Sequence, residues 1–154
     1  MFRGTWYHGL NGLDEALALR REVFVDEQGY SAENESDDID ARAMHAVIYD
    51  EDGIVATGRI YPDGYGKFHI GRVAVKKAKR GMGYGDLLVR MLLDKADTLG
   101  VKEVYTGAQA HAEGFYKTLG FVRCGEDYLD EGQPHIPMKM VGTAWRHCKS
   151  AEMI

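Results

Sequence analysis

The sequence predicts an α+β domain of α/β/α layers, with a mixed, mostly antiparallel central sheet and helices on its faces. Three consecutive β-type runs, joined by tight turns over residues 46–75, indicate an antiparallel meander. Residues 73–108 then follow a strand–helix–strand pattern, which predicts two parallel strands with a right-handed crossover between them. A chain of 154 residues without a linker or an internal repeat fits a single domain over residues 1–154.

The N-terminal part predicts a strand, a helix and an acidic loop. Residues 5–7 are β-formers ahead of a Gly/Asn turn, and apolar residues over 13–26 recur with a helical period. Residues 27–44 are acidic and nearly free of large aliphatic side chains, so we expect a loop or a loop with a broken helix. Its acidic side chains are either a solvated surface or a rim that attracts a cationic substrate.

The rest of the chain supplies the meander, the crossover and a short C-terminal part. Apolar residues over 87–99 recur at steps of three and four and predict an amphipathic helix that Gly100 ends. Further elements are expected as a strand over 101–108, a short helix over 112–119, a strand beginning within 121–124 and a last strand near 136–141. The tail over 145–154 carries no clear pattern.

Charge and composition narrow the function classes. A net charge of -5 argues against general nucleic-acid binding. No apolar run reaches the length of a membrane helix, and the N-terminus lacks a signal-peptide pattern, so we expect a soluble, cytoplasmic protein. Cys124 and Cys148 have no metal-site or disulfide spacing, so we expect two reduced thiols and no metal. One local basic cluster suits a small polyanion: Arg72, Lys76, Lys77, Lys79 and Arg80.

A glycine-rich turn between a strand and the amphipathic helix is the strongest functional feature. Such a helix start presents free N–H groups and a positive dipole end, which bind anions. A Walker A loop would require Lys and Ser or Thr after Gly85, and a Rossmann fingerprint would require a glycine where Asp86 stands. Both motifs are therefore excluded, and the remaining pattern is Arg-x-x-Gly-x-Gly with Arg80, Gly83 and Gly85.

This pattern resembles the acyl-CoA loop of the GNAT superfamily of N-acetyltransferases, and the run FYKTLGF at residues 115–121 matches a downstream signature of that family. VFVDEQG at 23–29, the acidic run at 35–40, His45 and GQPHIPM at 132–138 also look like the ElaA-type branch of small bacterial members. The resemblance reaches from the first helix to about Met140 and leaves out the tail after Val141.

The resemblance implies an acetyl-CoA-dependent N-acetyltransferase and a GNAT-like fold whose parallel pair splays at the acyl-CoA site. Acetyl-CoA is the expected cosubstrate, and a primary amine would attack it directly in a ternary complex. Acetyl-CoA and the amine are the expected partners, and neither a nucleic acid nor a membrane is expected. The sequence leaves open whether the chain forms a homodimer. The alternative is a non-catalytic or weakly catalytic acyl-CoA-binding sensor or interaction module on the same fold.

The matched motifs also imply individual roles. The coenzyme pyrophosphate is expected on the backbone of the turn, the pantetheine arm beside the preceding strand, and the leaving thiolate of CoA at Tyr116, whose phenol is protonated at neutral pH. Besides Tyr116, the expected cofactor-binding residues are Arg72, Val73, Ala74, Val75, Arg80, Gly81, Met82, Gly83, Tyr84, Gly85 and Asp86.

The sequence leaves the general base open. An amine with a pKa of about 10 must lose a proton near neutral pH, which requires a carboxylate or an imidazole. Tyr116 is the expected acid, and Glu27 and His111 are the expected catalytic bases among several candidates of suitable type. Those candidates are Glu27, Glu35, Asp38, His45, His111, Glu113 and His135. His111 and Glu113 also open a zinc deaminase motif, but its PCxxC part is absent. The expected substrate-binding residues are Glu27, Glu35, Asp38, His45 and His135.

Overall fold

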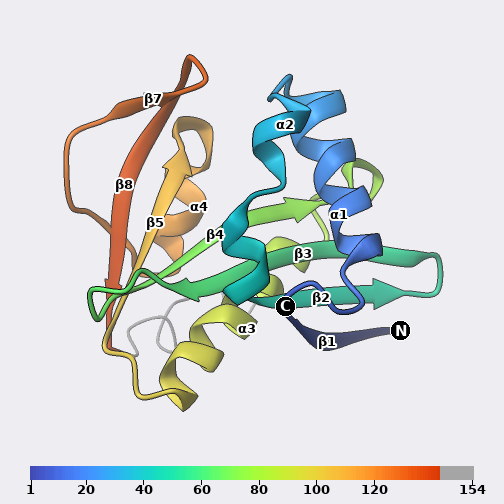
Figure 1. The fold of residues 1–154 in the computed structure, drawn as a ribbon, viewed down its shortest axis with the longest axis horizontal. Coiled ribbons are helices and arrows are strands. Elements are labelled where there is room, and N and C mark those ends of the chain that lie inside the picture. Colours follow the sequence, from blue (N-terminus) through green and yellow to red (C-terminus); the bar gives the residue numbers. More distant parts are fainter. Residues whose placement is uncertain (143–154) are drawn as a thin grey trace.

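The computed structural model describes residues 1–142 and contains an eight-stranded sheet of order β1-β2-β3-β4-β5-β8-β6, with β7 paired to β8 (Figure 1). The strands are β1 (Phe2–His8), β2 (Met44–Asp50), β3 (Gly53–Pro62), β4 (Phe68–Val75), β5 (Glu103–Gln109), β6 (Val122–Arg123), β7 (Tyr128–Asp130) and β8 (Gln133–Val141). The helices are α1 (Asp14–Arg20), η1 (Arg21–Glu27), α2 (Ala32–Glu35), η2 (Asp38–Arg42), η3 (Lys77–Lys79), α3 (Tyr84–Thr98), η4 (Ala110–Ala112) and α4 (Glu113–Thr118).

The predicted meander and crossover are confirmed. β2, β3 and β4 pair antiparallel in chain order, and β4 pairs parallel to β5 across α3. The parallel register contains only the pairs Phe68–Val104 and His69–Tyr105. Figure 1 shows β1 to β4 running across the picture, while β5 and β8 run close to vertical in opposite directions. The sheet therefore opens between β4 and β5 beyond His69.

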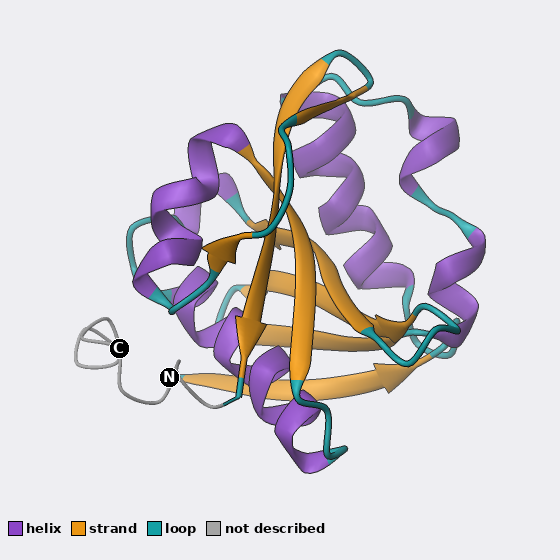
Figure 2. Cartoon of the chain, turned by 90° about the vertical axis from the view of Figure 1, so that its left-hand side faces the viewer, coloured by secondary structure: helices purple, strands orange, loops and turns teal. Residues whose placement is uncertain are grey.

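Alternation along β2 divides the core between the two faces of the sheet. Ala46 and Ile48 lie in the large hydrophobic cluster that α3 and α4 complete. Val47 and Tyr49 lie in a second cluster with Leu13 at the start of α1. Figure 2 shows helices on both sides of the strands. The expected mixed sheet with a helical layer on each face is therefore what the chain forms.

Gly58 of β3 permits the close approach of α3. A Cβ on Gly58 would lie 2.6 Å from Leu88 Cδ1 and 3.1 Å from Leu92 Cδ1, and both leucines are fully buried. We expect Gly58→Ala to lower the free energy of unfolding by about 1–3 kcal/mol, because the added methyl overpacks this contact.

Urea denaturation checks this prediction, with Gly114→Ala as the matched control. A Cβ on Gly114, in α4, would meet nothing within 4 Å. That substitution should leave stability unchanged or raise it by up to about 1 kcal/mol through helix propensity. Equal unfolding midpoints for the two variants would contradict the packing role of Gly58.

The remaining differences from the predicted elements are local. The first helix begins as α1 and continues without a break as a π-helix, η1. The short β7 was not predicted, and β8 begins at Gln133 and not near residue 136. The tail over 145–154 lies outside the described residues. Within residues 1–142, every helix falls short of the length and hydrophobicity that a membrane span needs.

Candidate active site

A cavity of about 750 Å³ opens where β4 and β5 separate. Residues 71–75 of β4 form one wall, and Thr106, Gly107 and Gln109 of β5 form another. η1 with the loop after it and α4 close the remaining sides. Because β4 pairs with β3 along its other side, the edge of β4 beyond His69 presents backbone N–H and C=O groups to the cavity.

The glycine-rich turn leaves the first turn of α3 free to accept an anion. Gly83 is the N-cap residue of α3, at φ 88°, and no side chain caps this helix start. Gly81 is also left-handed, at φ 77°, a backbone conformation that glycine adopts without strain. The helical hydrogen bonds begin only at Leu87, whose N–H donates to Gly83 O at 3.0 Å. The N–H groups before Leu87 are therefore the orphan donors of a helix N-terminus.

Arg80 of this turn is held by Glu27 at the end of η1. Its Nη1 and Nη2 lie 2.5 and 2.7 Å from the two carboxylate oxygens of Glu27, and its Nε donates to Val75 O at 3.1 Å. The hydrogen bonds from Arg80 lower the pKa of Glu27 because they stabilise the carboxylate. Both residues line the cavity. In this arrangement Glu27 is a weak proton acceptor.

Tyr116 of α4 lines the cavity and is 7% exposed. Burial raises its pKa to about 12, and a hydrogen bond with the Thr106 side chain opposes part of that shift. The rings of Phe115 and Phe121 pack edge-on against it, with centroids 5.1 and 5.3 Å away. The phenol therefore stays protonated at neutral and alkaline pH and can donate a hydrogen bond into the cavity.

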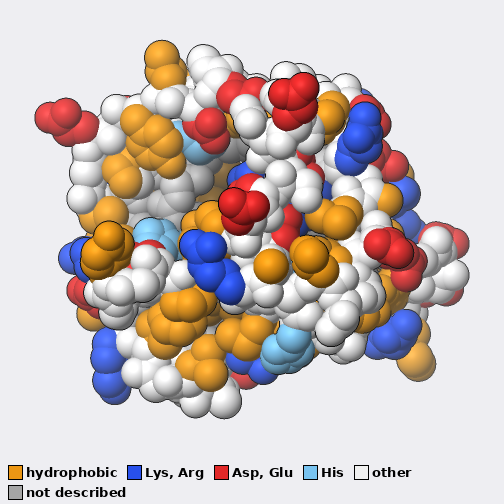
Figure 3. Space-filling view, viewed as in Figure 1, with side chains coloured by type: hydrophobic (Ala, Val, Ile, Leu, Met, Phe, Trp, Pro, Cys, Tyr) orange, Lys and Arg blue, Asp and Glu red, His pale blue; other side chains and the backbone are white. Residues whose placement is uncertain are grey.

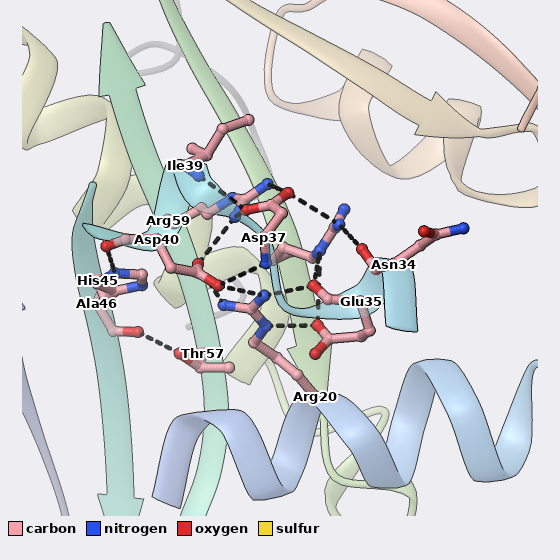
Figure 4. Close-up of polar contacts among 11 residues, drawn as sticks. Arg20, Asn34, Glu35, Asp37, Ile39, Asp40, His45, Ala46, Thr57 and Arg59 are labelled. Atoms are coloured by element: carbon pink, nitrogen blue, oxygen red, sulfur yellow. Dashed lines mark hydrogen bonds and ion pairs between the residues drawn. The ribbon is translucent and has the colours of Figure 1, made fainter. Parts of the chain in front are cut away.

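The acidic segment is folded into buried ion pairs (Figure 4). Arg20 of α1 reaches Glu35 Oε1 at 2.6 Å and Asp40 Oδ1 at 2.8 Å. Arg59 of β3 reaches Asp37 Oδ1 at 2.7 Å and Asp40 Oδ1 at 2.8 Å. Glu35 and Asp40 are 7% and 0% exposed. The expectation of a solvated acidic surface is therefore wrong for these two carboxylates, whose charges are compensated inside the protein.

Arg72 joins this network to the cavity wall. Its φ of 50° is left-handed, which costs a non-glycine residue about 1 kcal/mol or more. Its guanidinium donates to the carbonyls of Glu35 and Asn34 at 3.0 and 3.2 Å and pairs with Asp37 at 3.3 Å. These bonds hold α2 against the opened edge of β4, so the side chain of Arg72 lies on the α2 side of the cavity.

The structure brings together most, but not all, of the residues predicted from the sequence. Asp38 is exposed and does not line the cavity. On the face drawn in Figure 3, acidic side chains gather over α2 and near the β7–β8 hairpin. His45 is 1% exposed, with its Nε2 3.1 Å from Asp40 O. The predicted residues that line the cavity are Glu27, Glu35, Arg72, Val73, Ala74, Val75, Arg80, Gly85, His111, Tyr116 and His135. Those that lie in the turn or the first turn of α3, outside the lining, are Gly81, Met82, Gly83, Tyr84 and Asp86.

Several polar residues of the cavity were not selected from the sequence. The loop after η1 provides a local signal for some of them, because Gly29 is left-handed at φ 81° and Tyr30 N–H donates back to Phe24 O at 2.8 Å. This turn directs the chain after the helix along the cavity. The additional polar residues are Gln28, Tyr30, Asn34, Thr106, Gln109, Asp130 and Glu131. Among residues 1–142, no group of three or more His, Cys, Asp or Glu side chains is arranged to hold a metal ion.

Comparisons with known proteins agree with the fold. A sequence model of the acetyltransferase (GNAT) domain matches residues 12–141. The uncharacterized N-acetyltransferase YjcF of Bacillus subtilis is 38% identical over 128 residues, which cover 82% of this chain and 90% of YjcF. The crystal structure of Escherichia coli ElaA has a TM-score of 0.80 at 34% identity and covers 90% of this chain and 99% of that one. An acyl-CoA N-acyltransferase from Pseudomonas aeruginosa has a TM-score of 0.81 at 32% identity, over 92% of this chain and 100% of its own.

Proposed function

The chain belongs to the GNAT acetyltransferase family, and on that premise we propose that it is an acetyl-CoA-dependent N-acetyltransferase whose acceptor is a primary amine. The amine attacks the thioester directly in a ternary complex. The observation that carries the proposal is the cavity between the splayed strands β4 and β5, which has the turn residues Arg80 and Gly85 and the buried Tyr116 in its lining. A relative named as an acyl-CoA N-acyltransferase supports the choice of cosubstrate.

The two ends of the cosubstrate have matching donors. The free N–H groups at the start of α3 suit a pyrophosphate, because a helix N-terminus stabilises negative charge. The unpaired edge of β4 over residues 71–75 suits the amide-bearing pantetheine arm, which would pair with it as an added strand does. In this placement an N–H at Val73 or Ala74 stabilises the oxyanion of the tetrahedral intermediate.

Tyr116 donates a hydrogen bond to the departing sulfur when the tetrahedral intermediate breaks down. Sulfur gains negative charge as the carbon–sulfur bond breaks, and a buried phenol with a pKa of about 12 remains a hydrogen-bond donor throughout. The nitrogen of the intermediate loses its second proton and the departing sulfur gains one. Starting from the ammonium form of the amine, the products are therefore the amide, the CoA thiol and one released proton. Glu27, already bound through both oxygens to Arg80, is better suited to fixing the turn than to removing the amine proton.

Two measurements test this function: calorimetric titration with CoA, and a thiol-release assay with acetyl-CoA across a panel of primary amines. Absence of CoA binding would contradict the proposal. CoA binding without thiol release for any amine would favour the sensor or interaction module on the same fold.

Gly81→Ala and Gly64→Ala form a matched pair for the turn. Both glycines are left-handed, at φ 77° and 85°, and a Cβ on either would meet nothing within 4 Å. Each variant should therefore lose about 1 kcal/mol of stability. We expect only Gly81→Ala to weaken CoA binding, by about tenfold, because a shifted turn misaims its N–H groups. Equal CoA affinities for the two variants would exclude the turn as the phosphate site.

A further inference from the structure

The Tyr30 hydroxyl lies between two polar side chains on the cavity wall. Its Oη is 3.4 Å from Nε2 of His135 on β8 and 3.3 Å from Nε2 of Gln109 at the end of β5. Gln109 and His135 are directly opposite each other in the antiparallel pair of β5 and β8. All three residues line the cavity, and His135 is 6% exposed. Three separate segments therefore converge on one hydroxyl group.

The hydrogen bonds determine where the protons are. Nδ1 of His135 lies 2.9 Å from the carbonyl oxygen of Gln133, which can only accept a hydrogen bond, so Nδ1 carries the proton. In the neutral ring Nε2 is then an acceptor and faces the Tyr30 hydroxyl. The amide Nε2 of Gln109 donates to Gln28 Oε1 at 2.7 Å and to Tyr30. Tyr30 thus accepts from Gln109 and donates to His135, and its oxygen keeps a second lone pair.

We infer that Tyr30 and His135 together take the proton from the acceptor ammonium group. This inference rests on the proposed function. One N–H bond of the ammonium breaks as its proton moves to the Tyr30 oxygen, and the Tyr30 O–H bond breaks as its proton moves to Nε2 of His135. The products of the step are a neutral amine, an unchanged tyrosine and an imidazolium, which later releases the proton to water. Tyr30 contacts the amine, and His135 acts through Tyr30 and holds the proton at the end of the step.

The groups around the pair keep the Tyr30 hydroxyl protonated. Tyr128 of β7 stacks on the His135 ring, with centroids 5.5 Å apart. Asp130 and Glu131 of the β7–β8 hairpin raise the pKa of Tyr30 by their charge, while the hydrogen bond from Gln109 and the charge of Arg72 lower it. Burial and these carboxylates raise the pKa of Tyr30, so its hydroxyl stays protonated and relays a proton without first ionising.

The hairpin is also fixed against the loop that carries Tyr30. Ser31 N–H donates to Glu131 Oε1 at 2.9 Å, and the Gln133 side chain donates to Gln28 O at 2.9 Å. These bonds hold the loop and the β7–β8 hairpin together on both sides of the relay. Glu27, by contrast, has both carboxylate oxygens bound to Arg80, and His111 is exposed at the cavity edge.

Tyr30→Phe tests the relay, with Tyr61→Phe as the matched control. Tyr61 stacks on His69 and does not line the cavity. Using the amine that the panel identifies, we expect Tyr30→Phe to lower kcat/KM at least about tenfold near neutral pH. The deficit should shrink as the pH rises through the pKa of the amine, because a neutral amine needs no base. His135→Gln should give the same profile, and Tyr61→Phe the wild-type profile.

A loss of kcat/KM in Tyr30→Phe that is equal at every pH, or no loss at all, would overturn the relay. A merely structural role would not depend on the protonation of the amine. Nitrogen NMR of the wild-type protein provides a second measurement that needs no acceptor. We expect the Nδ1–H tautomer at His135, and an Nε2–H tautomer would overturn the inference. CoA titration of each variant separates this failure from failure of the proposed function, since the relay variants should bind CoA as the wild type does.

Discussion

Tyr116→Phe is expected to lower kcat about 10²-fold, or about 2.7 kcal/mol of transition-state stabilisation, while CoA affinity changes little. The substitution keeps the ring between Phe115 and Phe121 and removes only the hydroxyl. Because sulfur carries substantial negative charge only as the thioester bond breaks, a donor at this position stabilises the transition state more than the ground state. The measurement is steady-state thiol release together with CoA titration.

The pKa of Tyr116 determines how it acts. Complete transfer of a proton from a phenol with a pKa of about 12 to the thiolate of a thiol with a pKa of about 8.5 would cost about 5 kcal/mol. Hydrogen-bond donation during bond cleavage has no such cost. Ionisation of Tyr116 should therefore cause no fall in the kcat of the wild type below about pH 11.

Tyr105→Phe is the matched control for this prediction. Tyr105 immediately precedes Thr106 on β5 and lies outside the cavity lining, and its hydroxyl donates to Glu103 at 2.9 Å. Its removal should leave kcat within about twofold of the wild type, as for most surface changes. Unchanged kcat in Tyr116→Phe would remove Tyr116 as the donor and leave the fold and the CoA turn intact.

The parts of the site that the sequence revealed are those encoded in contiguous residues. The turn at residues 80–85 is recognisable because left-handed glycines and the start of an amphipathic helix occur side by side. The same is true of residues 115–121, where one short helix carries Tyr116. The meander was predictable because tight turns join neighbouring strands.

The buried network could be predicted only in part. Arg20 falls on the apolar stripe of the first helix, which predicts that its aliphatic stem is buried, whereas the structure buries its guanidinium as well. Nothing local says which carboxylates pair with the guanidinium, because Glu35 and Asp40 are 15 and 20 residues away and meet Arg20 only in the folded chain. An acidic run therefore resembles a solvated surface until its partners are known.

The sequence does not predict the contact between Tyr30 and His135. Tyr30 and His135 are 105 residues apart, and no spacing rule connects them. Their meeting depends on the π-helical end of η1, on β8 starting at Gln133 and on the unpredicted β7. Tertiary structure alone gives the histidine its tautomer, since the carbonyl that accepts from Nδ1 belongs to a strand whose beginning the sequence did not define.

Asp40→Asn is expected to lower the free energy of unfolding by about 3–5 kcal/mol at neutral pH. Asp40 is 0% exposed and accepts from both Arg20 and Arg59. The network has three arginines and three carboxylates, with Arg72 and Asp37 completing it, so removal of one negative charge leaves buried positive charge uncompensated. Urea denaturation measures the loss, with Asp38→Asn, an exposed neighbour on η2, as the control.

The pH dependence of the free energy of unfolding distinguishes the effect of the Asp40 charge from the effect of packing at this position. Burial by itself would raise the pKa of Asp40, but Arg20 and Arg59 outweigh it and lower the pKa from 3.8 to about 2. A lowered pKa stabilises the folded state fully above the unfolded value and loses that contribution as the pH falls through the folded value. The wild type should therefore lose about 2 kcal/mol through this group between about pH 4 and pH 2, whereas Asp40→Asn should not. Parallel stability curves for the two proteins over this range would show that the carboxylate charge of Asp40 does not hold Arg20 and Arg59 in place.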